Sequence, residues 1–187
     1  NPALVIGYHK PVLPDRADNV ADVTSQILSE GRTSRLYRAL VLEKQLATGV
    51  GTTTGPGDKY PNLFIVSATP RAPHTVEEVE AAIYAEIQRL AEEGPNPEEL
   101  QKVKNQLDAD VLRTLRSNSG LANLLAYFTG LTGDPKYLER HVEDLKSVTA
   151  EEVQNFIKAY LVAPNRTVGW IAPEKDKAVA GPGNGKM

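Results

Sequence analysis

Three histidines are the residues of this chain best suited to hold a catalytic metal: His9, His74 and His141. A helical zinc motif such as H-x-x-E-H needs two imidazoles one helical turn apart, so that both reach the same ion. The nearest pair in this sequence, His9 and His74, is 65 residues apart. We therefore predict structural histidines at a strand end, in a turn before a helix cap and on a solvated helix face, respectively. A site assembled from all three in space is the alternative.

A run of arginines is the second group that could do chemistry: Arg32, Arg35 and Arg38 at the start of a predicted helix. Residues three apart share one side of a helix, so these guanidinium groups are expected to lie together. Two interpretations are open. The arginines form a solvated basic face, or they bind an anionic or carbonyl group, which the planar fork of guanidinium donors suits.

Other kinds of catalytic site find no support in the sequence. The chain has no cysteine, which excludes disulfides, thiolate zinc sites, iron–sulfur clusters and cysteine nucleophiles. It contains no G-x-S-x-G segment for a serine nucleophile, and its glycines fit neither a dinucleotide-binding nor a phosphate-binding loop. The many glutamates fall in first helical turns or on polar faces, which is typical of helix capping and of a solvated surface.

The composition also limits the partners. Lys and Arg total 21 against 24 Asp and Glu, a net charge of -3, and aromatic residues make up 6% of the chain. This balance favours neither nucleic acid nor an anionic membrane as a partner. No apolar stretch approaches the ~20 residues needed to span a bilayer. We expect no nucleic-acid binding and no membrane span.

The elements around these residues predict one mixed α+β domain. Strands are expected at residues 3–9, 47–54, 63–69 and 166–172. Helices are expected at residues 15–31, 33–44, 75–94, 96–116, 121–131, 134–145 and 149–160. The helix at 33–44 is expected to bury Leu36, Leu40 and Leu42, and the two middle strands read as an antiparallel hairpin. This order predicts an antiparallel sheet of about four or more strands, with one face covered by helices.

The chain is expected to divide into a folded part and a tail. The domain is predicted over residues 1–173, and a flexible Gly-rich tail over residues 174–187. Asn1 leads directly into a strand, without a methionine or a basic leader segment. We expect a piece of a longer polypeptide, whose targeting signal would lie in another part.

Residues 29–50, SEGRTSRLYRALVLEKQLATGV, resemble the segment that opens the second domain of M16 family zinc peptidases. That family includes pitrilysin, insulin-degrading enzyme and the mitochondrial processing peptidase. Residues 96–100 and 102–106 are similar to the long central helix of the family. The residues similar to the closing helix and strand of the family are Tyr137, Leu138, Ile157, Tyr160, Leu161, Asn165 and Arg166. The likeness extends over residues 3–173.

The resemblance implies a fold of the LuxS/MPP-like metallohydrolase type, in which related domains pair to enclose a chamber. In the family the zinc is bound by an H-x-x-E-H motif in the first domain. The resemblance thus implies that this chain binds no cofactor, and that Zn is held by a missing N-terminal domain or a partner subunit. Many second domains supply an arginine and a tyrosine, seven positions apart, that hold the substrate backbone. The matching positions here are Val41 and Thr48, and neither side chain can do that work.

The leading hypothesis is the non-catalytic second domain of an M16 zinc metallopeptidase, which shapes the proteolytic chamber and its partner contacts. The chain alone is expected to be inactive, with no catalytic residue, and Arg32, Arg35 and Arg38 are candidate contacts for substrate or partner. Its expected partners are an N-terminal M16 domain of the same polypeptide, another M16 subunit in a homodimer or heterodimer, and a peptide substrate.

Two alternatives stay open. One is an inactive M16-like scaffold subunit that takes no part in proteolysis, like the core subunits of the respiratory bc1 complex. The other is a self-contained enzyme with a dispersed site around His9 or the arginines. The family likeness gives the bacterial periplasm as the expected location.

Overall fold

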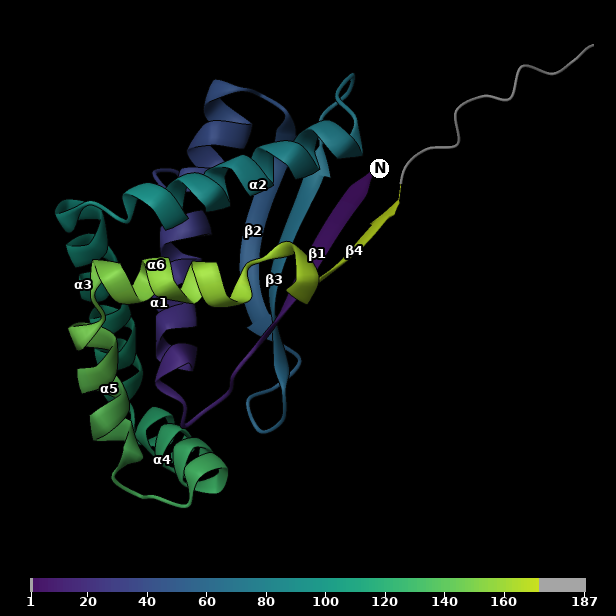
Figure 1. The fold of residues 1–187 in the computed structure, drawn as a ribbon. Coiled ribbons are helices and arrows are strands. Elements are labelled where there is room, and N and C mark those ends of the chain that lie inside the picture. Colours follow the sequence, from purple (N-terminus) through teal and green to yellow (C-terminus); the bar gives the residue numbers. More distant parts are fainter. Residues whose placement is uncertain (1, 172–187) are drawn as a thin grey trace, which may run out of the picture.

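The computed structural model describes residues 2–171, so the tail expected at residues 174–187 and the boundary at residue 173 lie outside the described residues. The elements follow one another along the chain from strand to helices, hairpin, helices and strand (Figure 1). They are β1 (Ala3–Lys10), α1 (Arg16–Ser29), the π-helix η1 (Tyr37–Glu43), β2 (Ala47–Gly55), β3 (Asn62–Pro70), α2 (Val76–Glu93), α3 (Pro97–Leu115), α4 (Asn118–Thr132), α5 (Tyr137–Ser147), α6 (Ala150–Tyr160), the 3-10 turn η2 (Ala163–Asn165) and β4 (Arg166–Ile171).

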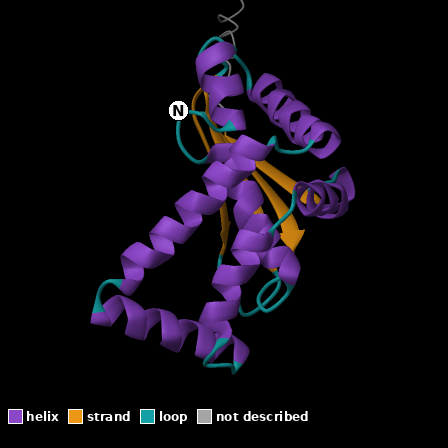
Figure 2. Ribbon diagram, turned by 90° about the vertical axis from the view of Figure 1, so that its left-hand side faces the viewer, coloured by secondary structure: helices purple, strands orange, loops and turns teal. Residues whose placement is uncertain are grey.

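The four strands form one antiparallel sheet in the order β2-β3-β1-β4. The helices gather on one side of this sheet, and from that side they stand in front of the strands (Figure 2). Helices α1, α2 and α6 and the π-helix η1 contact the sheet. The predicted α+β fold, with an antiparallel sheet of four strands and one helical layer, is confirmed.

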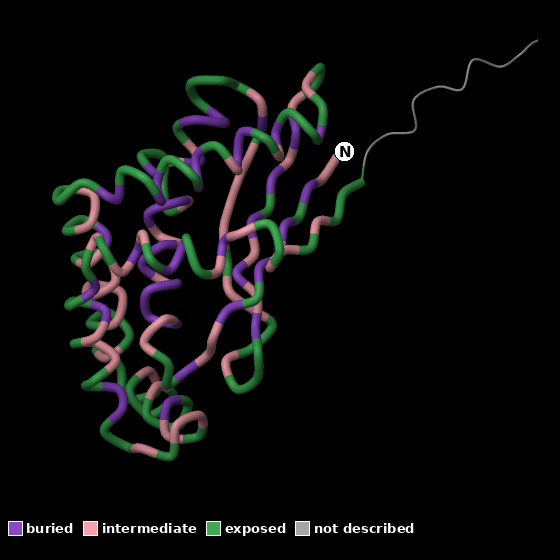
Figure 3. Tube along the Cα trace, in the orientation of Figure 1, coloured by how far each residue is buried: buried purple, intermediate pink, exposed green. Residues whose placement is uncertain are grey.

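The two faces of the sheet differ because side chains alternate along each strand. In β1, Leu4, Ile6 and Tyr8 point toward the helices and are at most 1% exposed. The intervening Val5 is 46% exposed on the opposite face, which we call the open face. The same alternation runs through β3, where Ser67 is exposed between buried neighbours (Figure 3).

Most helix starts follow the sequence rules. Asp15 caps α1, and Thr75, Asn96 and Thr149 each form a capping box with a glutamate three residues later. The start expected at Asp134 is wrong: α5 begins at Tyr137, and its N-cap residue makes no side-chain capping bond. The Asp134 carboxylate instead accepts a hydrogen bond from the backbone N–H of Lys136 at 2.9 Å, which forms a turn before the helix.

The helix expected at residues 33–44 winds as a π-helix over most of its length. The backbone N–H of Lys44 donates to the carbonyl of Ala39, five residues back, at 3.0 Å. The wider turn changes which residues face the core. Leu36, Leu40 and Val41 are buried, whereas Leu42, expected in the core, is 42% exposed.

Helices α3, α4 and α5 form the outer part of the helical layer (Figure 1). They pack mainly against one another and against α1, around a small second core of Leu13, Phe128, Tyr137 and Leu138. The main core lies between the sheet and α1, α2, η1 and α6. None of the described helices is both long enough and apolar enough to cross a membrane.

Candidate functional site

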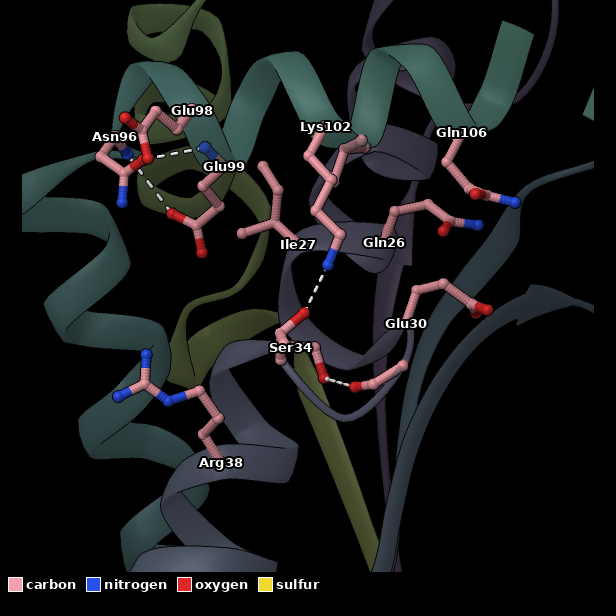
Figure 4. A pocket seen from close by; sticks show the side chains of 13 residues that line it. Gln26, Ile27, Glu30, Ser34, Arg38, Asn96, Glu98, Glu99, Lys102 and Gln106 are labelled. Carbon is pink, nitrogen blue, oxygen red and sulfur yellow. Dashed lines mark hydrogen bonds between the residues drawn. The ribbon is translucent and has the colours of Figure 1, made fainter. Parts of the chain in front are cut away.

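A cavity of about 490 Å³ lies between the last turn of α1, the loop that follows it and the first turns of α3 (Figure 4). Most of its lining residues have polar side chains, with amides, carboxylates, hydroxyls and two cationic groups. The polar lining residues are Gln26, Glu30, Thr33, Ser34, Arg38, Asn96, Glu98, Glu99, Lys102 and Gln106. We call it the α1–α3 cavity.

Local sequence signals build both walls of this cavity. Helix α1 ends at Ser29, and Gly31 follows with φ +75°, a left-handed conformation that glycine adopts without strain. The Ser34 hydroxyl then donates to the Gly31 carbonyl at 2.7 Å, which tightens the loop. On the other wall, Asn96 and Glu99 cap the start of α3. The cavity therefore joins the end of one helix to the start of another.

A smaller cavity of about 240 Å³ lies beside it, on the η1 side. Both cavities are lined by Thr33, Arg38, Asn96 and Glu99, and the smaller one adds Arg35. Two of the three predicted arginines thus reach one cavity, while Arg32 is exposed and lines neither.

Arg35 holds the loop to the start of α3. Its Nε donates to Glu99 Oε1 at 2.9 Å and its Nη2 to Glu99 Oε2 at 2.8 Å, and Nη2 also donates to the Gly94 carbonyl at 2.9 Å. Its side chain is 11% exposed. Arg38 is different, because it pairs with Glu43 at 3.0 Å and stays 60% exposed. The predicted arginine cluster therefore divides into one anchored residue and two accessible residues.

The two positions that match the family arginine and tyrosine lie in different environments. Val41 is 8% exposed and belongs to the main core, so its side chain does not point into either cavity. Thr48 is exposed on β2, and its hydroxyl donates to the Thr69 carbonyl at 3.3 Å. Neither residue lines the two cavities.

The histidines occupy three different environments. His9 is exposed at the end of β1, and the His74 ring lies 3.1 Å from Glu78 Oε2 before α2. His141, expected on a solvated face, instead packs against the rings of Phe128 and Tyr137, because it follows Tyr137 by one helical turn. Burial lowers the pKa of the His141 imidazole. Within residues 2–171, no three His, Cys, Asp or Glu side chains are placed to hold a metal ion.

Sequence reasoning missed the α1 wall of the larger cavity and the polar face of α3 opposite it. Gln26 and Glu30 are one turn apart on α1, and Lys102 and Gln106 are one turn apart on α3. Their helical spacing was the available signal, yet such pairs are common on solvated faces. Only the packing of α3 against α1 brings the two pairs to one cavity.

A buried acidic group was also missed. Lys10 and Asp18 form a buried ion pair, and Asp22 follows Asp18 by one turn of α1. Burial, with the nearby Asp18 carboxylate, raises the pKa of Asp22 to about 7. This group lines none of the cavities described above.

Several known proteins resemble this chain. The zinc protease PqqE of Helicobacter pylori (strain ATCC 700392 / 26695) is 29% identical over 156 residues, which are 79% of this chain and 35% of the relative. A protease structure from Helicobacter pylori has a TM-score of 0.84 at 22% identity, over 92% of this chain and 41% of that one. This chain thus spans well under half the length of these relatives.

Two further structures share the fold. An inactive peptidase domain from Bordetella parapertussis has a TM-score of 0.82 at 23% identity, over 97% of this chain and 96% of that one. The periplasmic protease PqqL from Escherichia coli has a TM-score of 0.72 at 17% identity, over 92% of this chain and 19% of that one. The sequence itself matches the family described as the peptidase M16 inactive domain over residues 1–107. Since that match covers more than half of the chain, this protein belongs to the M16 peptidase family, as an inactive domain of the C-terminal type.

Proposed function

We propose that this chain is the non-catalytic second domain of an M16 zinc metallopeptidase, and that the open face of its sheet forms part of the chamber wall. The observation that carries this proposal is the asymmetry of the sheet. The described helices lie on one side of the sheet (Figure 2), while the other side leaves Val5, on the inner strand β1, 46% exposed.

The open face has the features of a surface that faces another body. A shallow hollow of about 200 Å³ lies on it, lined in part by Ala3, Val5, Gly49, Ser67 and Thr69. These side chains are small and carry no charge, so a chain can approach the backbone closely there. Sheets with one uncovered face normally present polar side chains to water, and exposed apolar surface marks an interaction site.

The zinc of such an enzyme would be held outside this chain. The three histidines lie in separate places, so the described residues do not fit a zinc site. We assign the metal to an N-terminal M16 domain of the same polypeptide or to another M16 subunit, in a homodimer or heterodimer. This chain would then contribute by enclosing the peptide and limiting its access to water.

Substrate clamping is the part of the family mechanism that this chain is least equipped to perform. Val41 has no hydrogen-bond donor and lies in the core, and the Thr48 hydroxyl is short. In the proposed enzyme a partner chain supplies those contacts. We further propose a periplasmic location, supported by the fold it shares with periplasmic PqqL.

The test compares this chain alone with the complete polypeptide. Metal analysis after dialysis should find no stoichiometric zinc on the isolated chain, and a fluorogenic peptide should stay uncleaved. The complete enzyme, meaning the full polypeptide together with any partner M16 subunit, should bind zinc and cleave the peptide in a chelator-sensitive way. Chelator-sensitive cleavage by the isolated chain, or a complete enzyme without zinc and activity, would overturn the proposal.

A further inference from the structure

We propose that the α1 side of the α1–α3 cavity binds a basic side chain, the guanidinium or ammonium of an arginine or lysine in a peptide. This goes beyond the proposed function, because the cavity lies among the helices and not on the open face that would line the chamber. The inference comes from an imbalance in the cavity: its cationic side chains already have partners, while its acceptors on the α1 side do not.

Three donor side chains of the cavity are occupied within the chain. The Lys102 ammonium donates to the Thr33 hydroxyl, and the Gln106 amide donates to Asp110 at 3.2 Å. The Arg38 guanidinium pairs with Glu43 at 3.0 Å. An anionic ligand would have to compete with all three of these contacts.

The acceptors on the α1 wall are free. The Gln26 Oε1 atom is buried and has no hydrogen-bond partner among the described residues. The Glu30 carboxylate, one helical turn further on, makes no hydrogen bond or ion pair within residues 2–171. A buried carbonyl oxygen without a donor is costly, so a ligand that donates to it gains more than one that binds at the surface.

The end of α1 adds a second electrostatic reason. The C-terminal end of a helix carries partial negative charge and favours cations, yet α1 has no basic residue in its last turn. Across the cavity, the positive end of α3 already has Glu98 and Glu99 in its first turn. Helix α1 itself therefore supplies no cation to its negative end.

The side chains are arranged for one donor-rich group. Gln26, Glu30 and Gln106 lie on the same side of the cavity, whereas the Lys102 side chain extends toward the loop (Figure 4). A guanidinium carries five N–H donors in a plane and an ammonium carries three, so either group can contact several acceptors at once. The positive charge of Lys102 repels a bound cation. Removing that charge should therefore leave cation binding equal or stronger, and it should weaken anion binding.

The first experiment titrates this chain with N-acetyl-arginine amide and follows the backbone amides by NMR. The neutral analogue N-acetyl-citrulline amide has nearly the same shape and serves as the control ligand. The arginine probe should shift residues 26–30 and 102–106, and it should bind at least about tenfold more tightly than the citrulline probe, because a charge-assisted contact is lost. Equal binding of the two probes, or no binding, would overturn the proposal.

Variants then separate the cation site from its alternative. Glu30→Gln should weaken the arginine probe at least about tenfold. Glu151→Gln, at an exposed acid in the first turn of α6, should leave binding unchanged. Lys102→Met should leave the affinity equal or tighten it. Weaker binding by Lys102→Met, or binding of N-acetyl-glutamate amide, would show an anion site and contradict the proposal. Thermal unfolding of each variant checks that it is folded.

These outcomes are independent of the proposed peptidase role. The probe titration uses this chain without a zinc domain, so a failure there leaves zinc content and peptide cleavage by the complete polypeptide untouched. Failure of the complete polypeptide to cleave peptides would likewise leave the measured affinity of the cavity as it stands.

Discussion

The two faces of the sheet use the same strands for different purposes. On the covered face, Leu4, Ile6 and Tyr8 are packed against helices. On the open face, the intervening residues include the exposed Val5 and a shallow hollow with small side chains. The side chains on one face of the sheet are therefore buried, whereas those on the other face are only partly covered. In the proposed function, the partly covered face is the one turned toward another domain of the enzyme.

The largest expected effect is the difference in stability between a substitution on the covered face and one on the open face. Ile6→Ala should lower the free energy of unfolding by about 3 kcal/mol, because it leaves a cavity in a fully buried site. Val5→Ala should lower it by less than about 1 kcal/mol, because Val5 is 46% exposed. Urea denaturation of both variants measures the contrast. Similar losses would mean that the open face is packed in this chain as well.

The second prediction concerns how much Arg35 and Arg38 each stabilise the fold. Arg35→Ala should destabilise the chain by about 2 kcal/mol, since Glu99 and the Gly94 carbonyl lose a shared partner. Arg38→Ala should change stability by less than about 0.5 kcal/mol, because an exposed ion pair contributes little. Equal effects in thermal unfolding would contradict the division between an anchored and an accessible arginine.

A smaller effect should come from the partly buried carboxyl of Asp22 on α1. Its folded-state pKa of about 7 lies above the ordinary value of 3.8, so the folded chain binds this proton more tightly than the unfolded chain does. Stability from this group is therefore complete below pH 4 and is lost as the pH rises toward 7. Asp22→Asn should raise stability at pH 8 by about 1–2 kcal/mol and change it little at pH 4.

Lys10, Asp18 and Asp58 are the charged groups that act on Asp22, and they are the same in both proteins compared in this measurement. Comparing wild type and Asp22→Asn at each pH isolates the single carboxyl. A difference between the two proteins that stays constant from pH 4 to pH 8 would rule out the raised pKa. A difference that grows with pH would support it.

The fold was predictable where the signals are local. The strand expected at residues 3–9 and the helices expected from residues 75 and 149 depend on neighbours within four residues, and the structure has a strand and two helices there. The π-helix η1 was not predictable, because an α-helix and a π-helix draw on the same residue types and differ by one residue per turn.

The site was less predictable, because it depends on contacts between distant segments. Arg35 finds Glu99 64 residues away, so no local pattern could separate an anchoring arginine from a ligand-binding one. The α1–α3 cavity likewise forms only where α1 packs against α3. By contrast, the absence of the family arginine and tyrosine could be predicted from alignment alone, at Val41 and Thr48. The consequence of that absence for substrate binding stays a prediction.

The most direct test of the central claim places a charge on the open face of the complete polypeptide. Val5→Glu should reduce peptide turnover at least about tenfold, because it buries a charge where the chamber wall meets the peptide or another domain. Leu112→Glu is the matched control, since Leu112 is 53% exposed on α3, in the helical layer away from the open face. Turnover by the Leu112→Glu variant should be unchanged. This chain on its own, carrying either substitution, should unfold within a few degrees of the wild-type chain. Unchanged turnover in Val5→Glu, or an equal loss in both variants, would contradict the account.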